Sequence, residues 1–177
     1  MKVARRNTLM AAGASLAALA AFLGLDRKAR AGAPGAMVPA GAAGQHWEVE
    51  HSEDEWRRRL SPQQFAVLRE SATERSFTSP LNGEKHAGVF ACAGCQLALF
   101  SSRTKFESGT GWPSFYEPLP NAVGTTEDRA FGMTRMAVHC RRCGGHLGHV
   151  FDDGPAPTGL RYCINGVALT FQPEGKS

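Results

Sequence analysis

The sequence has 177 residues and a mass of 19.0 kDa, which is enough for one ordinary domain and too short for two of average size. Its hydrophobic content of 42% and charged content of 20% are those of a globular protein, and they exclude a disordered or collagen-like chain. The formal net charge of +4 comes from residues 1–31; the rest of the chain has 14 basic and 15 acidic residues, so its net charge of −1 excludes a nucleic-acid partner.

Residues 1–31 have the pattern of an export signal. The pair Arg5-Arg6 precedes 18 uncharged residues, Thr8–Leu25, and Ala29-Arg30-Ala31 supplies an A-x-A cleavage site. The paired arginines resemble a twin-arginine signal, so we expect an exported, periplasmic protein. One alternative is an uncleaved membrane anchor facing the periplasm, because 18 residues is near the lower limit for a span. The other is a cytoplasmic protein with an unusual N-terminus.

Residues 32–46 are rich in Gly, Ala and Pro and are expected to form a flexible linker, followed by a single domain over residues 47–175. Two helix start signals open this domain. Ser52 and Ser61 are each followed three residues later by Glu or Gln, the pattern of a capping box, and a proline follows Ser61 in the first helical position. The apolar residues spaced for the buried faces of these helices are Trp56, Leu60, Phe65 and Leu68.

From Ser76 onward the helical period disappears. Short apolar runs lie between clusters of Gly, Pro, Asn and Asp, at 88–91, 97–100, 133–139, 149–151, 161–165 and 167–171. This spacing predicts a mainly β fold of antiparallel sheets, with the two helices clasping the sheet and covering one of its edges.

Four of the five cysteines form two C-x-x-C pairs, Cys92 with Cys95 and Cys140 with Cys143, separated by 44 residues. Two such turns brought together make a closed four-cysteine site, which favours one structural zinc per chain. Twin-arginine export also favours zinc, because that route carries proteins that are already folded and metal-loaded. The alternatives are two disulfides, which an exported protein could form, and a redox-active pair.

The fifth cysteine, Cys163, has no partner among the other four and is a candidate reactive thiol. The run around it alternates like a strand, so Arg161, Cys163 and Asn165 should share one face. A guanidinium beside a thiol lowers the pKa of the thiol toward the nucleophilic thiolate. The alternative is an inert buried cysteine with two solvent-facing neighbours.

Two histidines, His146 and His149, follow the second cysteine pair. They could be metal ligands, general acids or structural residues; because four thiolates already satisfy a zinc ion, an acid or substrate-orienting role is favoured. Trp112 lies on a glycine-flanked loop, where an aromatic ring either fills the core or lines a pocket for a small apolar group such as a methyl.

These residues together resemble the peptide-methionine (R)-S-oxide reductases, the B-type methionine sulfoxide reductases, over about residues 48–171. The matching segments are Ser79–Asn82, Cys92–Cys95, Thr104–Gly109, Gly111–Phe115, His139–Phe151, Asp153–Pro155 and Thr158–Asn165. The resemblance implies a β-tent fold around a structural zinc, with Cys163 as the nucleophile. It also implies a substrate pocket around that thiol. We place His146, His149 and Asn165 with Cys163 in catalysis, and Trp112, Phe115 and Arg161 in substrate binding.

The expected chemistry is reduction of methionine-R-sulfoxide in oxidised proteins, with a sulfenic acid on Cys163 as the intermediate. Many members of the family have a second, resolving cysteine where this sequence has Thr110, and the sequence has no sixth cysteine. An external thiol reductant is therefore expected, either a thioredoxin-like or another exported thiol protein, acting on a monomer. The rival interpretations are a non-catalytic zinc module and a C-x-x-C thiol–disulfide oxidoreductase.

Overall fold

The computed structural model describes residues 46–175; the expected signal and the linker up to residue 45 lie outside the described residues. Two helices open this part of the chain, α1 (Glu53–Arg59) and α2 (Pro62–Glu70). The strands are β1 (Gly88–Cys92), β2 (Ala98–Ser101), β3 (Lys105–Phe106), β4 (Ser114–Phe115), β5 (Val123–Asp128), β6 (Arg135–Cys140), β7 (His146–Phe151), β8 (Arg161–Ile164) and β9 (Leu169–Pro173). No helix between residues 46 and 175 is long and apolar enough to cross a membrane.

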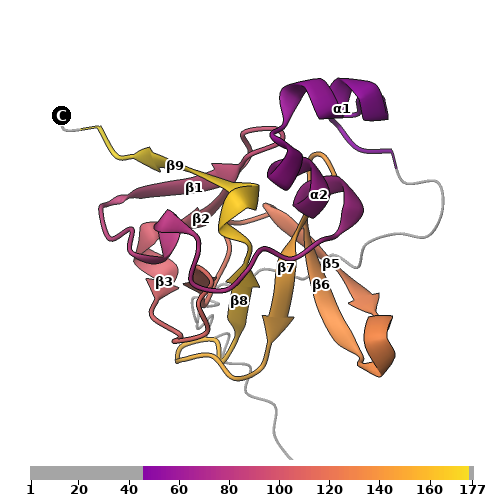
Figure 1. Cartoon of the computed structure of the whole chain (residues 1–177). Helices are drawn as coiled ribbons and strands as arrows, with labels where there is room; N and C mark the ends of the chain where they lie inside the picture. The colour runs from indigo at the N-terminus through magenta and orange to yellow at the C-terminus, as the bar shows by residue number, and fades with distance from the viewer. Residues whose placement is uncertain (1–45, 176–177) are drawn as a thin grey trace, which may run out of the picture. The chain divides into compact units, whose positions relative to one another are not determined.

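The strands form two antiparallel sheets, which confirms the predicted fold class. The smaller sheet has the order β2-β1-β9, and the larger has the order β3-β4-β8-β7-β6-β5. Figure 1 shows the smaller sheet beside the half of the larger sheet that contains β3 and β8, with β7, β6 and β5 extending away from it on the other side. Strands β8 and β7 lie in the interior of the larger sheet, so the sequence around Cys163 is held by a neighbour on each side.

An aromatic cluster joins the two sheets. The ring of Phe115 stacks on Phe100 at a centroid distance of 4.4 Å and meets Phe90 edge-on at 5.0 Å, and Tyr162 lies 5.8 Å from Phe100. All four side chains are buried. Aromatic pairs at these distances add to the free energy gained by burying their surface, so this cluster fixes how the sheets meet.

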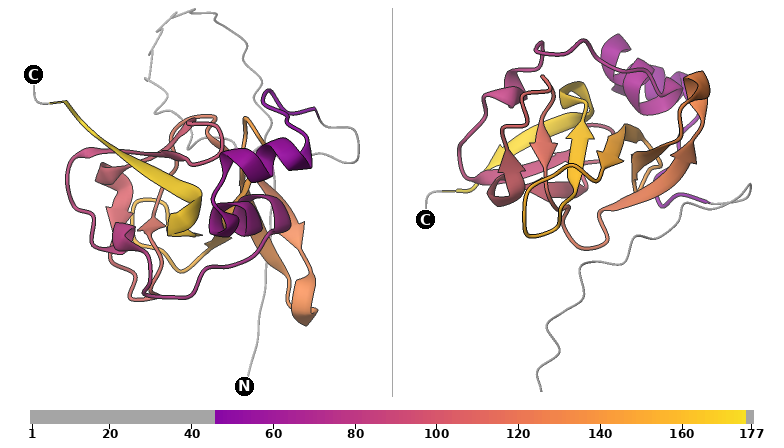
Figure 2. Two further views of the ribbon diagram at one scale, coloured as in Figure 1. Left: turned by 45° about the horizontal axis from the view of Figure 1, so that its top comes forward. Right: turned by 90° about the horizontal axis from the view of Figure 1, so that it is seen from below.

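Both helices start where the sequence predicts. The Ser52 hydroxyl accepts a hydrogen bond from the Glu55 amide, and at Ser61 the complete capping box with Gln64 is present. We expected the helices to cover a sheet edge, but α2 packs against β7, an interior strand, and against the 3₁₀ turn Gly166–Ala168. The buried side chains of α2 are Phe65, Val67 and Leu68, and the helix therefore covers an interior strand and leaves the sheet edges open to other elements. Figure 2 shows the helices from two further sides.

Candidate active site and metal centre

The four paired cysteines come together in the structure, from two separate turns. Cys92 ends β1 and Cys140 ends β6, and Cys95 and Cys143 lie in the turns that follow these strands. Their four Sγ atoms all lie within 4.8 Å of one another, with contacts of 3.7 Å between Cys92 and Cys143 and 3.5 Å between Cys95 and Cys140. A tetrahedral ion bound at about 2.3 Å separates its sulfur ligands by about 3.8 Å, whereas a disulfide needs about 2.05 Å. The donor set and its spacing therefore fit one metal ion.

The packing around this cluster holds the turns in place. The Arg69 guanidinium of α2 donates two hydrogen bonds, of 3.1 and 3.0 Å, to the Cys143 carbonyl, and its charge lies 4.8 Å from the Trp56 ring. At Gly94 a β-carbon would lie 3.6–3.7 Å from Trp56, Leu68 and the Cys143 sulfur. The helices thus pack directly on the two turns that carry the ligands.

Cys163 lies elsewhere, in the middle of the larger sheet. On β8 it is the register partner of His149 on β7 and of Ser114 on β4. Directly opposed residues in an antiparallel sheet point to the same face, with their β-carbons about 4.5–5.5 Å apart. Cys163 is half-buried, and the Thr110 hydroxyl lies 3.8 Å from its sulfur. The sheet therefore places an imidazole on one side of the thiol and hydroxyl groups on the other.

A chain of hydroxyls leads away from the thiol. The Thr110 hydroxyl is 2.8 Å from that of Ser108, which is 2.7 Å from that of Ser114, and Ser114 donates to the Trp112 carbonyl at 3.1 Å. Since each hydroxyl both donates and accepts, the chain can orient a hydrogen bond to Cys163 and fixes the backbone of the loop next to Trp112.

Arg161 lowers the pKa of the Cys163 thiol, as predicted, but burial outweighs it. Burial raises that pKa above its ordinary value, and the opposing effects of the Thr110 hydroxyl and the Arg161 guanidinium are smaller. The guanidinium is already engaged, because it donates two hydrogen bonds of 2.8 Å to Asp153 and lies 4.4 Å from the Phe151 ring. Without substrate, the thiol form of Cys163 is favoured.

The two histidines meet edge to face, with ring centroids 5.4 Å apart. Burial and the neighbouring His149 lower the pKa of His146 to about 4, so its imidazole is neutral near pH 7, and its buried Nε2 has no hydrogen-bond partner among the described residues. His149 Nε2 lies 2.8 Å from the Asp128 carboxylate. Hydrogen bonds from the Ala130 amide and from His149, together with the charge of Arg135, lower the pKa of Asp128 to about 2, so this carboxylate is ionised. Arg135 also donates to Asp128 at 2.9 Å.

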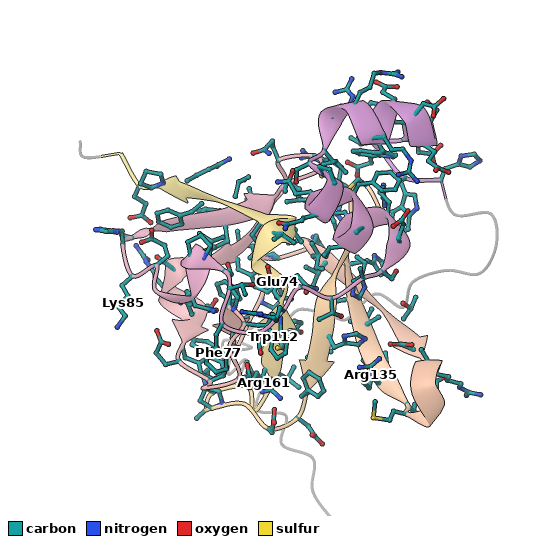
Figure 3. All side chains as sticks on the ribbon, viewed as in Figure 1. Glu74, Phe77, Lys85, Trp112, Arg135 and Arg161 are labelled. Atoms are coloured by element: carbon teal, nitrogen blue, oxygen red, sulfur yellow. The ribbon has the colours of Figure 1, made fainter. Side chains whose placement is uncertain are left out.

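Glu74 links the tryptophan loop to the turn after Cys163. Trp112 Nε1 donates to the Glu74 carbonyl at 3.1 Å, and the Glu74 amide donates to Asn165 Oδ1 at 3.0 Å. The Glu74 carboxylate accepts hydrogen bonds from the Gly166 and Val167 amides. Figure 3 shows Glu74 next to Trp112.

Comparison with known proteins identifies the family. Residues 60–173 match the model of the SelR domain. The chain is 57% identical over 127 residues to the peptide methionine sulfoxide reductase MsrB of Methanosarcina barkeri, an alignment that covers 71% of this chain and 89% of that protein. It is 50% identical over 130 residues to the protein of the same name from Leptospira interrogans, covering 73% and 99%. The chain belongs to the MsrB family.

Within this MsrB-family fold, the expected site residues do not all face the thiol. Phe115 is a correction: its side chain is fully buried against Phe90 and Phe100, so it supports the core and has no surface for a substrate. Asn165 is 3% exposed. Its side-chain amide donates to the Leu147 carbonyl at 2.9 Å and accepts a hydrogen bond from the Glu74 amide. Asn165 therefore positions the neighbouring backbone.

Other residues that contact the expected site residues were not predicted from the sequence. They are Glu74, Ser108, Ser114, Asp128 and Arg135. A signal existed for Ser114, because it precedes Phe115 in the segment that resembles the family. Asp128 and Arg135 lie 21 and 14 residues from His149, and only the pairing of β5, β6 and β7 brings them together.

Proposed function

We propose that this protein reduces the R epimer of methionine sulfoxide in peptides and proteins to methionine, with Cys163 as the nucleophile. As an MsrB-family member it is a peptide methionine sulfoxide reductase, an oxidoreductase that acts on the sulfoxide group. The observation that carries the finer proposal is the sheet register, which sets the Cys163 thiol opposite His149 and beside the hydroxyl of Thr110.

In the first half-reaction the Cys163 sulfur attacks the sulfoxide and its oxygen is transferred. The thiol gives up its proton and the S–O bond of the substrate breaks. Methionine is released, and Cys163 is left as a sulfenic acid. A raised thiol pKa suits this order of steps, because Cys163 keeps its proton until the S–O bond of the substrate weakens, when the sulfoxide oxygen needs it. One proton is moved and none is consumed.

The histidines supply the path for that proton. His149 donates its Nε2 hydrogen to the ionised Asp128, which leaves Nδ1 as the ring nitrogen available to a substrate. His146 is neutral and has an unpartnered Nε2 in a buried position, so it suits a hydrogen bond to a polar but uncharged oxygen. The protonated form of His149 is the proposed acid, and His146 orients the oxygen.

The two sides of the thiol differ, which supports selection of one epimer. The loop with Trp112 leads into β4 on one side of Cys163, and the histidines belong to β7 on the other. Suppose that the methyl group of the sulfoxide contacts the indole and its oxygen contacts the imidazoles. Only one configuration at sulfur then directs the rest of the methionine outward. The mirror-image epimer would exchange two of these groups.

Return of Cys163 to the thiol requires external thiols. The Thr110 side chain, 3.8 Å from its sulfur, ends in a hydroxyl, which cannot form a disulfide. A first thiol therefore attacks the sulfenic acid, giving a mixed disulfide and water, and a second thiol releases Cys163 and leaves as a disulfide. Thioredoxin should be a poorer donor here than for family members with a resolving cysteine.

We assign the metal site of Cys92, Cys95, Cys140 and Cys143 to zinc. Four thiolates in a compact cluster are the ligand set of a closed structural zinc site, and no open position is left for a substrate. When bound, zinc would supply folding free energy and no step of the reaction.

Export is the proposed fate of the chain. Its support is the sequence of residues 1–31, with Arg5-Arg6 and the A-x-A site ending at Ala31. N-terminal sequencing of the protein purified from the periplasm should find a start near residue 32. Recovery of the intact leader in the membrane fraction would support the anchor instead.

Stereopure substrates test the reductase proposal. The wild type should reduce R-sulfoxide in a peptide with dithiothreitol and leave the S epimer untouched, and Cys163→Ser should be inactive while keeping its fold and metal. Equal turnover of both epimers, or an active Ser variant, would refute the proposal.

Chemical trapping tests the recycling step. After one equivalent of R-sulfoxide, wild-type Cys163 should react with dimedone. In Thr110→Cys the introduced thiol would stand at the position now 3.8 Å from the Cys163 sulfur, so that variant should instead form an internal disulfide and turn over faster with thioredoxin. A wild-type disulfide from Cys163 to a metal-site cysteine, formed with zinc release, would overturn the single-cysteine mechanism.

A further inference from the structure

Phe77 is an exposed aromatic residue beside the tryptophan loop. Among the side chains that the structure describes, two large apolar ones are exposed, Phe77 at 73% and Met133 at 53%. Phe77 lies in the segment between α2 and the 3₁₀ turn Pro80–Asn82, and Met133 lies near the start of β6. A single exposed apolar residue needs no explanation, but the position and backbone of Phe77 call for one.

The backbone of Phe77 is strained. Its φ is +63°, in the left-handed region that bulky residues avoid. The conformation is held by a 2.7 Å hydrogen bond from the Phe77 amide to the Gly111 carbonyl, which also accepts one of 2.8 Å from the Asn82 side chain. A residue kept in such a conformation with its ring in solvent costs stability without adding core packing, and such outliers cluster at ligand-binding sites.

The ring lies against the loop that contacts the nucleophile. A β-carbon on Gly111 would meet the Phe77 ring at 2.7 Å, so glycine is required there and the ring covers the backbone of the loop. Gly111 stands between Trp112 and Thr110, whose hydroxyl is 3.8 Å from the Cys163 sulfur. Figure 3 shows Phe77 beside Trp112, with Arg135 farther away. Phe77 thus packs on the loop that carries Trp112 and that reaches Cys163 through Thr110.

We propose that Phe77 contacts an apolar side chain next to the oxidised methionine of a substrate polypeptide, and so selects for sequence around the sulfoxide. This inference rests on the proposed reaction at Cys163. A methionine sulfoxide whose sulfur reaches Cys163 brings its neighbouring residues, about 3.3 Å apart along an extended chain, over the surface next to the loop that carries Trp112. The strained backbone holds the ring outward, where a flanking Leu or Phe would bury it.

Matched peptides test this inference with the full chain. We would compare kcat/KM for N-acetyl-methionine-R-sulfoxide amide with that for pentapeptides carrying Leu or Ser before or after the sulfoxide. On one of the two sides the wild type should prefer Leu over Ser about tenfold, the change produced by about 1.4 kcal/mol. That change corresponds to burial of about 55 Å² of apolar surface.

Variants then assign the preference to Phe77. Phe77→Ala should remove the preference for Leu, Phe77→Leu should keep part of it, and Met133→Ala should keep all of it. Should the alanine variant fold poorly, Phe77→Asn repeats the test, because asparagine tolerates a left-handed φ.

Several results would overturn the inference. A wild type indifferent to the flanking residue would do so, as would a Phe77→Ala variant that loses activity equally on the capped amino acid and on every peptide, which would show a structural role. A wild type that reduces no sulfoxide at all would refute the reductase proposal itself, before any variant is compared.

Discussion

The Cys163 sulfur lies next to hydroxyl and imidazole groups, and burial affects its pKa more than the Arg161 guanidinium does. Sequence spacing put Arg161 on the same face as Cys163, and both side chains are half-buried while the intervening Tyr162 is buried. Yet the guanidinium donates to Asp153, and burial has the largest effect on the pKa of the thiol, which it raises. Spacing predicts which face a residue occupies, whereas its hydrogen-bond partners depend on loops that return from elsewhere in the chain.

Asp128 is expected to act on the reaction through His149. Asp128→Asn should lower kcat for a capped R-sulfoxide by about 10²-fold and alter the pH dependence of kcat. The neutral amide would accept a weaker hydrogen bond from His149 Nε2 than the ionised carboxylate does, so it would orient the imidazole less well. The matched control is Glu127→Gln, since Glu127 pairs at 2.9 Å with the exposed Arg129 instead. Steady-state kinetics from pH 5 to 9 would show it. Equal losses in both variants would argue against a role for Asp128.

The buried His146 should make stability depend on pH. Its folded pKa, about 4, lies below the unfolded value of about 6.5, so the unfolded chain binds more protons between these values. Stability is therefore complete above pH 6.5 and falls as the pH drops toward 4. Between pH 7 and 5 the free energy of unfolding of wild type should fall by about 1–2 kcal/mol more than that of His146→Gln. If urea unfolding shows the same loss of free energy between pH 7 and 5 in both proteins, His146 is not the group responsible.

At the scale of elements, short-range signals predicted the two helices and most strands, because caps and alternation are local. They missed β5, whose residues Thr125, Thr126, Glu127 and Asp128 are polar. Without β5 the partner of His149 could not be found. Phe115 was assigned to substrate binding on the family resemblance of the segment Gly111–Phe115. Sheet register reverses that assignment, since Ser114 opposes Cys163 while Phe115 opposes the buried Tyr162.

The close approach of β7 and β8 depends on Gly148. It opposes Ile164, and a β-carbon there would overlap the Cys163 carbonyl oxygen. Gly148→Ala should therefore push the strands apart, cost about 1–3 kcal/mol of stability and move Cys163 away from His149, with loss of activity. As a control, Gly83→Ala has ordinary φ and only one atom, at 3.9 Å, near the new carbon, so it should be neutral. Thermal unfolding and turnover measure both, and an active, stable Gly148→Ala would disprove the requirement.

At the scale of the whole molecule, the metal site ties together parts of the chain that the sheets leave separate. Cys92 belongs to the smaller sheet and Cys140 to the larger, and α2 packs on both turns through Leu68 and Arg69. Cys163 belongs to neither turn. The reaction site and the metal site are thus separate in position but share one scaffold, since β7 begins just after Cys143 and carries both histidines.

Removal of the metal should therefore unfold the domain rather than merely inactivate it. Structural zinc contributes about 10–16 kcal/mol, comparable with the whole stability of about 5–15 kcal/mol of a typical domain. Native mass spectrometry should find one zinc per chain in wild type and in Cys163→Ser. Cys95→Ala, or wild type treated with a strong chelator, should lose zinc together with its near-ultraviolet circular dichroism. A folded, metal-free protein with its four site cysteines in two disulfides would show that the cluster is a covalent crosslink instead, and chelator would then leave both fold and turnover unchanged.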